Sequence, residues 1–182
     1  MLNWRYIIAL IFLTTLISCR PDFTAELNAT ESLMSVLSNV ESTSNDVDAR
    51  LIRQYAKDID QKCQKIQNET TDTVNLEDAQ SLVDFCGLEK HLQSCLSRKE
   101  MIDAELVRTR NQLFNLQSDL KEYRADKDSV NTHIEQEFLF VESLQEGADQ
   151  LIVELNSCFE TYAELKEEID RLIIDLPEKE EE

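Results

Sequence analysis

The chain has 182 residues and a formal net charge of −19, with 37 acidic residues against 18 basic ones. This surplus repels nucleic-acid phosphates and anionic lipid head groups, so we exclude nucleic acid as a partner. Only two glycines and two prolines are present. A sheet protein of this length needs more of both for its turns, and the predicted fold class is therefore all-α.

Residues 1–19 have the layout of a secretory signal peptide. Arg5 supplies a positive start, residues 6–17 are almost entirely apolar, and Ser18-Cys19 offers small residues for cleavage. The apolar run is shorter than the roughly 20 residues of a membrane-spanning helix. We therefore expect a secreted, extracellular protein without stable membrane insertion. The run Leu16-Ile17-Ser18-Cys19 also resembles a bacterial lipobox, so the alternative is an envelope protein anchored by an acylated Cys19.

Two sequons fit the secretory interpretation. They are Asn28-Ala29-Thr30 and Asn68-Glu69-Thr70, and each is a potential acceptor for an N-linked glycan on an exposed surface. We therefore expect glycosylation at Asn28 and Asn68.

A single helical coiled-coil domain is predicted over residues 31–176. A loosely ordered segment at 20–30 is expected before it, and a disordered acidic tail at 177–182 after it. The first helix, over about residues 31–67, has one apolar face. The polar stretch at 42–46 interrupts this face and predicts a break or kink, because its side chains compete for backbone hydrogen bonds.

The second half of the chain carries a long heptad repeat. From Leu92 to Leu176, alternate steps of three and four residues meet an apolar side chain at 21 of 25 positions, where chance would give about ten. The four exceptions are Lys99, Thr109, Lys127 and Glu137. A repeat held this long predicts long helices whose a and d positions form a buried seam against other helices.

The polar segment at 126–132 decides the architecture. Thr132 and Glu135 have the spacing of a capping box, which predicts a turn between helices at about 76–126 and 132–176. The e positions of the last helix are also apolar, as at Phe138 and Phe159, so this helix needs two neighbours. We therefore favour an antiparallel three-helix bundle, a coiled-coil hairpin of long helices.

An extended parallel dimeric coiled coil is the alternative fold. The heptad phase passes through 126–132 undisturbed, and a parallel dimer would pair opposite charges between g and e positions. The pairs are Arg98 with Asp103, Glu105 with Arg110, and Asp119 with Arg124.

Four cysteines follow the signal peptide, which in a secreted chain suggests two disulfides. Cys95 and Cys158 both occupy d positions, and their midpoint falls at the polar segment at 126–132, so a hairpin would bring them level. The midpoint of Cys63 and Cys86 falls near residue 74 or 75, at the edge of the connection expected at 68–75. The preferred connectivity is Cys63–Cys86 and Cys95–Cys158, and three connectivities are possible.

The sequence holds no recognisable catalytic or metal-binding motif. No C-x-x-C pair occurs, and Asp126-Lys127-Asp128 lacks the later oxygen ligand and glycine of a calcium loop. His91 and His133 fall at g positions on helix edges. We therefore expect no enzyme activity, no cofactor and no metal.

The expected function is binding to another macromolecule, an unknown protein or glycan, with a homo-oligomer also possible. Exposed aromatics at Phe138, Phe140 and Phe159 would supply the surface, although their heptad neighbourhood favours core packing for all three. The other hypotheses are a helical-bundle carrier of an apolar small molecule, a homodimeric spacer, and the lipid-anchored envelope protein.

Overall fold

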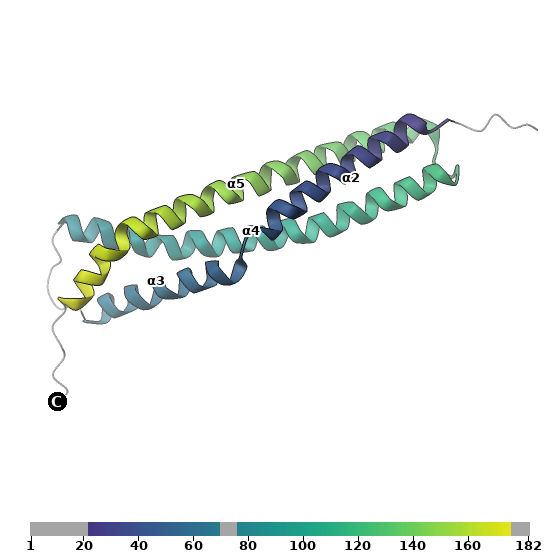
Figure 1. Ribbon diagram of the computed structural model, residues 1–182. Helices are drawn as coiled ribbons and strands as arrows, with labels where there is room; N and C mark the ends of the chain where they lie inside the picture. The colour runs from purple at the N-terminus through teal and green to yellow at the C-terminus, as the bar shows by residue number, and fades with distance from the viewer. Residues whose placement is uncertain (1–21, 70–75, 176–182) are drawn as a thin grey trace, which may run out of the picture.

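The computed structural model describes residues 22–69 and 76–175 of the chain. It contains the helices α2 (Thr24–Asn45), α3 (Ala49–Glu69), α4 (Leu76–Lys121) and α5 (Lys127–Ile174). Helices α4 and α5 form a long antiparallel hairpin, and α2 and α3 follow one another along it as one bent helix (Figure 1). The described residues contain no strand. The predicted all-α antiparallel three-helix bundle is confirmed.

The turn of the hairpin lies at residues 122–126, and α5 begins at Lys127, five residues before the predicted helix start at 132. Asp126 is the N-cap of α5, and its side chain accepts a hydrogen bond from the amide of Asp128 at 3.3 Å. Tyr123 adopts a left-handed conformation with φ of 57°, which lets the chain reverse after α4. The expected capping box at Thr132 is wrong, because the helix is already in progress there and buries Val130.

The intrachain turn also makes the extended parallel dimer wrong. Each of the charges assigned to that dimer has a partner inside this chain. Arg98 binds Glu154 at 2.7 Å, and Arg110 binds Glu41 at 2.6 Å. Arg124 binds Asp119 within the turn region at 3.0 Å. The heptad phase runs through the turn because the return helix resumes the same seam, not because the helix is continuous.

The expected loose segment at 20–30 is helical from Thr24 onward. The amide and hydroxyl of Thr24 both donate to the Asp22 carboxylate, at 3.0 and 2.6 Å. Phe23 is buried against Leu120 and Val130 beside the hairpin turn. One aromatic side chain thus anchors the start of α2 to the end of the bundle, a contact that local sequence does not reveal.

The first helix breaks at 46–48, directly after the polar stretch expected to interrupt it. Ser44 is buried and donates its hydroxyl to Asp103 at 2.6 Å. Lys99, one of the polar seam positions, is also buried and donates to Asp103 at 2.8 Å and to Ser44 at 3.4 Å. The break therefore lies where α2 is tied to α4 by polar contacts. Asp48 then caps α3 by accepting the amide of Arg50 at 2.8 Å.

Most of the other seam positions in the described residues are apolar and buried or half-buried, as the heptad repeat predicts. Fully buried members include Leu92, Leu113, Leu151 and Ile169. At the far end an aromatic cluster joins α3 to the hairpin, since Tyr55 lies 4.6 Å from the Tyr162 ring centroid and 4.9 Å from that of Phe159. This cluster explains why the e positions of α5 are apolar in this half: they pack against α3.

A polar network covers the aromatic cluster. Tyr162 donates to Asp58 at 2.6 Å, and Lys62 bridges Asp58 at 3.1 Å and Asp170 at 2.7 Å. Burial alone would raise the pKa of Asp58, but hydrogen bonds from Tyr162 and Lys62 outweigh burial and lower it. Burial raises the pKa of Tyr162, and the neighbouring Asp58 carboxylate raises it further. No helix in the described part of the chain is both long and apolar enough to cross a bilayer.

Candidate interaction surface

Two of the three aromatics assigned to the core lie on the surface. Phe138 is 53% exposed and Phe140 is 61% exposed, so the core assignment is wrong for both. Phe159 is half-buried against Tyr55, as core packing requires. Leu139, between the first two, is 63% exposed. We call Phe138, Leu139 and Phe140 the α5 ridge.

Helix geometry explains why the ridge faces outward. Glu137 and Val141 occupy the two seam positions on either side of it, and Val141 is fully buried. Consecutive residues of an α-helix are about 100° apart, so three of them span more than half of the circumference. Once the flanking residues face the seam, the ridge cannot also do so. The register of α5 therefore forces these three large apolar side chains to be exposed.

A shallow hollow adjoins the ridge on the outer face of α5. It has a volume of about 390 Å³ and is lined by Ile134, Glu135, Phe138 and Leu139. Ile134 and Phe138 are four residues apart, as are Glu135 and Leu139, so each pair lies along one side of the helix. The hollow is large enough to receive one apolar side chain of another molecule.

Glu137 precedes the ridge at a seam position. Its Oε2 atom is buried and has no hydrogen-bond partner in the described part of the structure. Burial raises the pKa of this carboxyl group above its ordinary value, while a nearby positive charge on His133 would lower it. The carboxylate is therefore a local cost to stability at neutral pH, and it lies next to the α5 ridge in the sequence.

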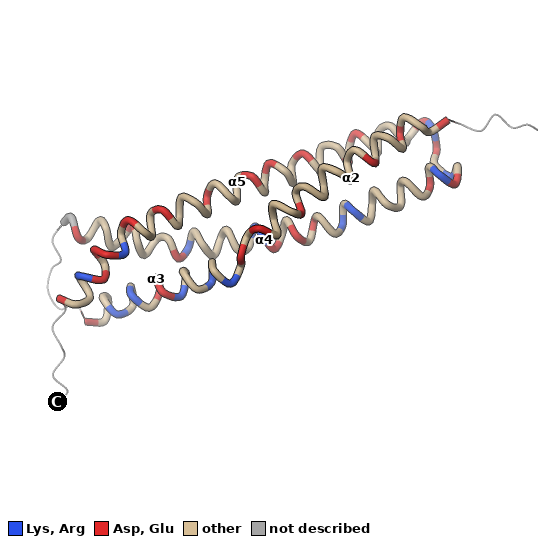
Figure 2. Tube along the Cα trace, in the orientation of Figure 1, with Lys and Arg blue, Asp and Glu red and all other residues tan. Residues whose placement is uncertain are grey.

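The charges around the ridge have one sign. Between Asp128 and Leu165, α5 contains neither Lys nor Arg. Figure 2 shows acidic positions along α5, with basic ones confined to its two ends. The exposed acids Glu135, Glu142 and Glu146 lie within two turns of the ridge, and none of the three forms a salt bridge with any described residue.

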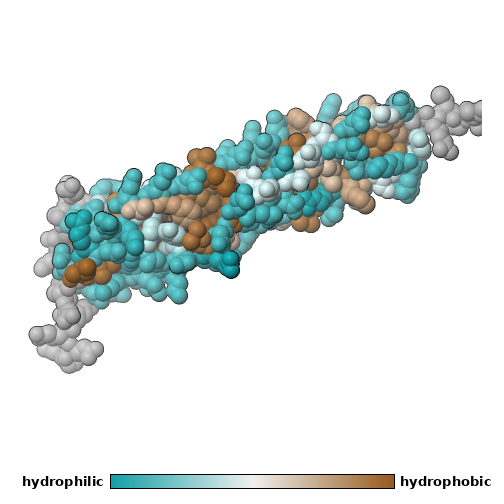
Figure 3. Space-filling model, in the orientation of Figure 1, coloured by the Kyte–Doolittle hydropathy of each residue, from teal (hydrophilic) through white to brown (hydrophobic). Residues whose placement is uncertain are grey.

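A second apolar area lies where α3 begins. Figure 3 shows apolar residues gathered there between α3 and α5. A cleft of about 140 Å³ is lined there by Val47, Leu51, Ile152 and Phe159 together with polar neighbours. Of the four apolar side chains, three are buried or half-buried in the core, and Leu51 is exposed. This area is the edge of the aromatic cluster rather than a separate ridge.

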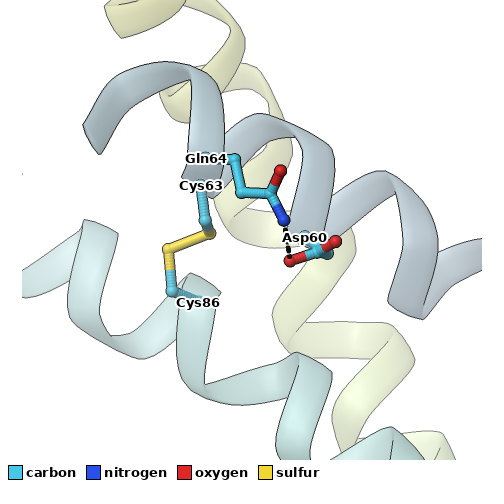
Figure 4. The surroundings of a disulfide bond; sticks show 4 residues. All are labelled: Asp60, Cys63, Gln64 and Cys86. Atoms are coloured by element: carbon cyan, nitrogen blue, oxygen red, sulfur yellow. Dashed lines mark hydrogen bonds between the residues drawn. A yellow bond between two sulfur atoms is a disulfide. The ribbon is translucent and has the colours of Figure 1, made fainter. Parts of the chain in front are cut away.

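One of the two predicted disulfides is present. Cys63 on α3 is bonded to Cys86 on α4, with a Cα–Cα distance of 5.9 Å (Figure 4). The Cys63–Cys86 prediction is confirmed. The bond closes the connection between these two helices and holds α3 against the hairpin, beside the Gln64–Asp60 hydrogen bond of 2.8 Å.

The other two cysteines are free thiols in the structure, so the second predicted bond is absent from it. The hairpin nevertheless brings Cys95 and Cys158 level, and the two buried thiols interact directly. They lie in a groove of about 570 Å³ between α4 and α5, whose walls include Arg98 and Glu154. Burial raises the pKa of Cys95 to about 11 and also raises that of Cys158.

Both predicted glycan acceptors are exposed. Asn28 lies on the outer face of α2, and Asn68 lies in the last turn of α3 rather than in the expected loop. Thr30 of the first sequon is buried and donates its hydroxyl to the carbonyl of Leu27 at 2.9 Å. The signal peptide at 1–19, Cys19 and the acidic tail at 177–182 lie outside the described residues.

The described residues contain no group of three or more His, Cys, Asp or Glu side chains arranged to hold a metal ion. His91 borders the groove over Cys95, and His133 is exposed near the start of α5. Comparison with models of known protein families, with curated proteins and with solved structures finds no match.

Leu139 was not predicted to be a surface residue, and the exposure of its two neighbours exceeds what their heptad positions predict. The available signal was the run Phe138-Leu139-Phe140-Val141, since four consecutive large apolar residues cannot all face one seam. The burial of Glu137 was open to prediction in the same way, because it occupies a d position of the repeat.

Proposed function

We propose that this protein is a secreted, N-glycosylated, non-enzymatic helical bundle that acts by binding another protein through the α5 ridge. The observation that carries the proposal is the exposure of three adjacent large apolar side chains on one helix of an otherwise well-packed bundle. Contiguous apolar surface on a folded domain commonly marks an interaction site. Phe138 and Phe140 are also of the residue type that is enriched at the centres of interfaces.

The arrangement of the rest of the molecule supports this role for the ridge. The Cys63–Cys86 bond and the aromatic cluster around Tyr162 hold the opposite half of the bundle together. The ridge lies on a long, continuous helix, which fixes the relative positions of its side chains. A rigid surface loses little conformational entropy on binding, and this favours affinity.

The alternative functions have less support. The wide apolar stripe that suggested a carrier of small molecules is occupied by α3, because Ile152 and Phe159 pack against the core cluster there. A spacer that depends on a parallel dimeric rod has lost its structural basis, since the chain folds back at 122–126.

Site-specific photo-crosslinking tests the proposal. A photoreactive residue is placed at Leu139 in one variant and at Val153 in another, since Val153 is 68% exposed on the same helix. The secreted protein is irradiated in the fluid into which it is released. We expect a discrete adduct from position 139 that disappears when Phe140→Ser is added, and no such adduct from position 153. Equal labelling from both positions, or none from either, would refute binding through the ridge.

A further inference from the structure

The surface around the α5 ridge also indicates the chemical class of its partner. We propose that the ridge binds a cationic amphipathic helix, a segment that carries Leu-like side chains on one face and Lys or Arg at its edges. This inference rests on the proposed function, because it names the partner of the same surface.

The backbone of α5 restricts the kind of partner that the ridge can bind. Every residue from Lys127 to Ile174 is helical, so the amides and carbonyls around the ridge are bonded within the helix. The surface therefore offers no free strand edge to which an extended peptide could add. Recognition must come from side chains alone, and an amphipathic helix provides them in rows while satisfying its own backbone.

The shape of the surface beside the ridge also suits a helical partner. The hollow of about 390 Å³ beside Phe138 and Leu139 follows the helix axis between Ile134 and Leu139. One apolar side chain of a partner helix can enter it, while neighbours three or four residues away contact Phe138 and Leu139.

The negative charge beside the ridge favours a cationic partner over the other candidates. Glu135, Glu142 and Glu146 surround the ridge and have no salt-bridge partner among the described residues. Acidic side chains elsewhere that are held in ion pairs include Glu154, which binds Arg98, and Glu41, which binds Arg110. A partner with Lys or Arg beside its apolar face could form ion pairs with these three glutamates. Long-range electrostatic attraction would also speed its association.

The same charges disfavour two other occupants. A second copy that docked through its own ridge would place α5 against α5, and this segment carries only acidic charges between Asp128 and Leu165. Anionic membranes would be repelled for the same reason. Both remain measurable outcomes of the test.

The experiment measures binding of a synthetic leucine–lysine amphipathic helix to the full secreted protein by calorimetry. A second peptide has glutamine in place of every lysine. We expect the lysine peptide to bind more tightly, and its affinity to fall as salt rises from 50 to 200 mM. The double variant Phe138→Ser/Phe140→Ser should weaken binding by at least about thirtyfold, because central aromatics dominate such contacts.

Matched charge variants separate the ridge from the general acidity of the protein. Glu135→Gln/Glu142→Gln/Glu146→Gln should weaken binding of the lysine peptide about tenfold, the sum of three modest charge contacts. Glu160→Gln/Glu164→Gln/Glu167→Gln removes three exposed charges farther along α5 and should change affinity less than about threefold. Equal effects of the two triple variants would overturn the proposal.

The failure of this inference is distinguishable from the failure of the proposed function. If both peptides bind equally and both depend on Phe138 and Phe140, the ridge is a docking surface but the cationic partner is wrong. If neither peptide depends on the ridge, the proposed surface is wrong as well. If sedimentation of the protein alone shows a dimer that depends on the ridge, the ridge binds a second copy. If the protein binds anionic vesicles through the ridge, the ridge binds a membrane. Either result would overturn the proposal of a cationic helix as the partner.

Discussion

Tyr162 on α5 donates a hydrogen bond of 2.6 Å to Asp58 on α3, although the two residues are 104 positions apart in the sequence. The bond lies at the edge of the aromatic cluster that holds α3 against the hairpin. Lys62 approaches the same Asp58 carboxylate from the next turn of α3. The stability of this half of the molecule should therefore depend on the protonation state of Asp58, which can be changed by pH.

The substitution Tyr162→Phe removes the hydroxyl group that donates to Asp58 and keeps the aromatic ring. We expect the free energy of unfolding to fall by about 1 kcal/mol, a value discounted because the carboxylate is partly exposed. Asp58 has a lowered pKa in the folded state, so its contribution is complete above its ordinary value of 3.8 and is lost as pH falls through the lower folded value. Urea unfolding at pH 7 and pH 3 measures this.

Tyr55→Phe is the matched control for that experiment. Tyr55 belongs to the same aromatic cluster but makes no hydrogen bond through its hydroxyl group within the described residues. The control should leave the free energy of unfolding within about 0.5 kcal/mol of the parent value. An equal loss in both variants would show that the rings matter and the hydrogen bond does not.

Glu137→Leu should stabilise the protein. Its buried Oε2 has no described partner, so removing the carboxylate should raise the free energy of unfolding at pH 7 by about 1 to 2 kcal/mol. Because burial raises the pKa of Glu137 in the folded state, the folded form of the parent is favoured by protonation. The advantage of the variant should therefore shrink as pH falls through the raised folded value toward the ordinary 4.5.

The control for Glu137→Leu is Glu142→Leu, which changes an exposed carboxylate on the same helix. We expect this variant to alter stability by less than about 0.5 kcal/mol, with no pH dependence of the kind expected for Glu137. Thermal unfolding across pH 4 to 8 compares the two. A loss of stability in Glu137→Leu would mean that the carboxylate has a partner that matters.

Cys95 and Cys158 should form an intrachain disulfide when the protein matures in an oxidising compartment. The two buried thiols already interact across the α4–α5 seam, so little rearrangement is needed. The bond should stabilise the fold by about 2 to 4 kcal/mol relative to Cys95→Ser/Cys158→Ser. Non-reducing peptide mapping of the secreted protein detects the linked peptides. Free thiols, or a link between two chains, would contradict the prediction.

The reactivity of the reduced thiols gives a second readout. Burial raises the pKa of Cys95 to about 11, so little thiolate is present at neutral pH. Alkylation of Cys95 in the reduced protein should be slow at pH 7 and should accelerate steeply toward pH 10. Rapid alkylation at pH 7 would show that the groove is open enough to solvate the thiol.

Much of the fold was predictable because the heptad repeat is a direct consequence of helix geometry. Seam positions such as Leu113 and Ile169 are buried as their phase requires, and even Lys99 is buried at its a position. The Cys63–Cys86 bond was predictable because the two cysteines lie a few turns to either side of one connection between helices. These features depend on spacing alone, and spacing is fully visible in the sequence.

The details that were missed depend on contacts between distant segments. The helical start at Thr24 follows from Phe23 packing on Leu120 and Val130, which nothing near residue 23 announces. The turn lies at 122–126 because Asp126 caps α5, a role for which Thr132 was an equally good local candidate. The exposure of Phe140, by contrast, follows from the local register of α5 and could have been predicted from the run of apolar residues at 138–141.

The side chains of the α5 ridge form exposed surface, whereas Phe159 belongs to the core. The most direct test compares the free energies of unfolding of Phe140→Ser and Phe159→Ala by urea titration. We predict that Phe140→Ser stays within about 0.5 kcal/mol of the parent, and that Phe159→Ala loses about 3 kcal/mol. If Phe140→Ser were destabilised as much as Phe159→Ala, Phe140 would be a core residue and the proposed binding surface would be wrong.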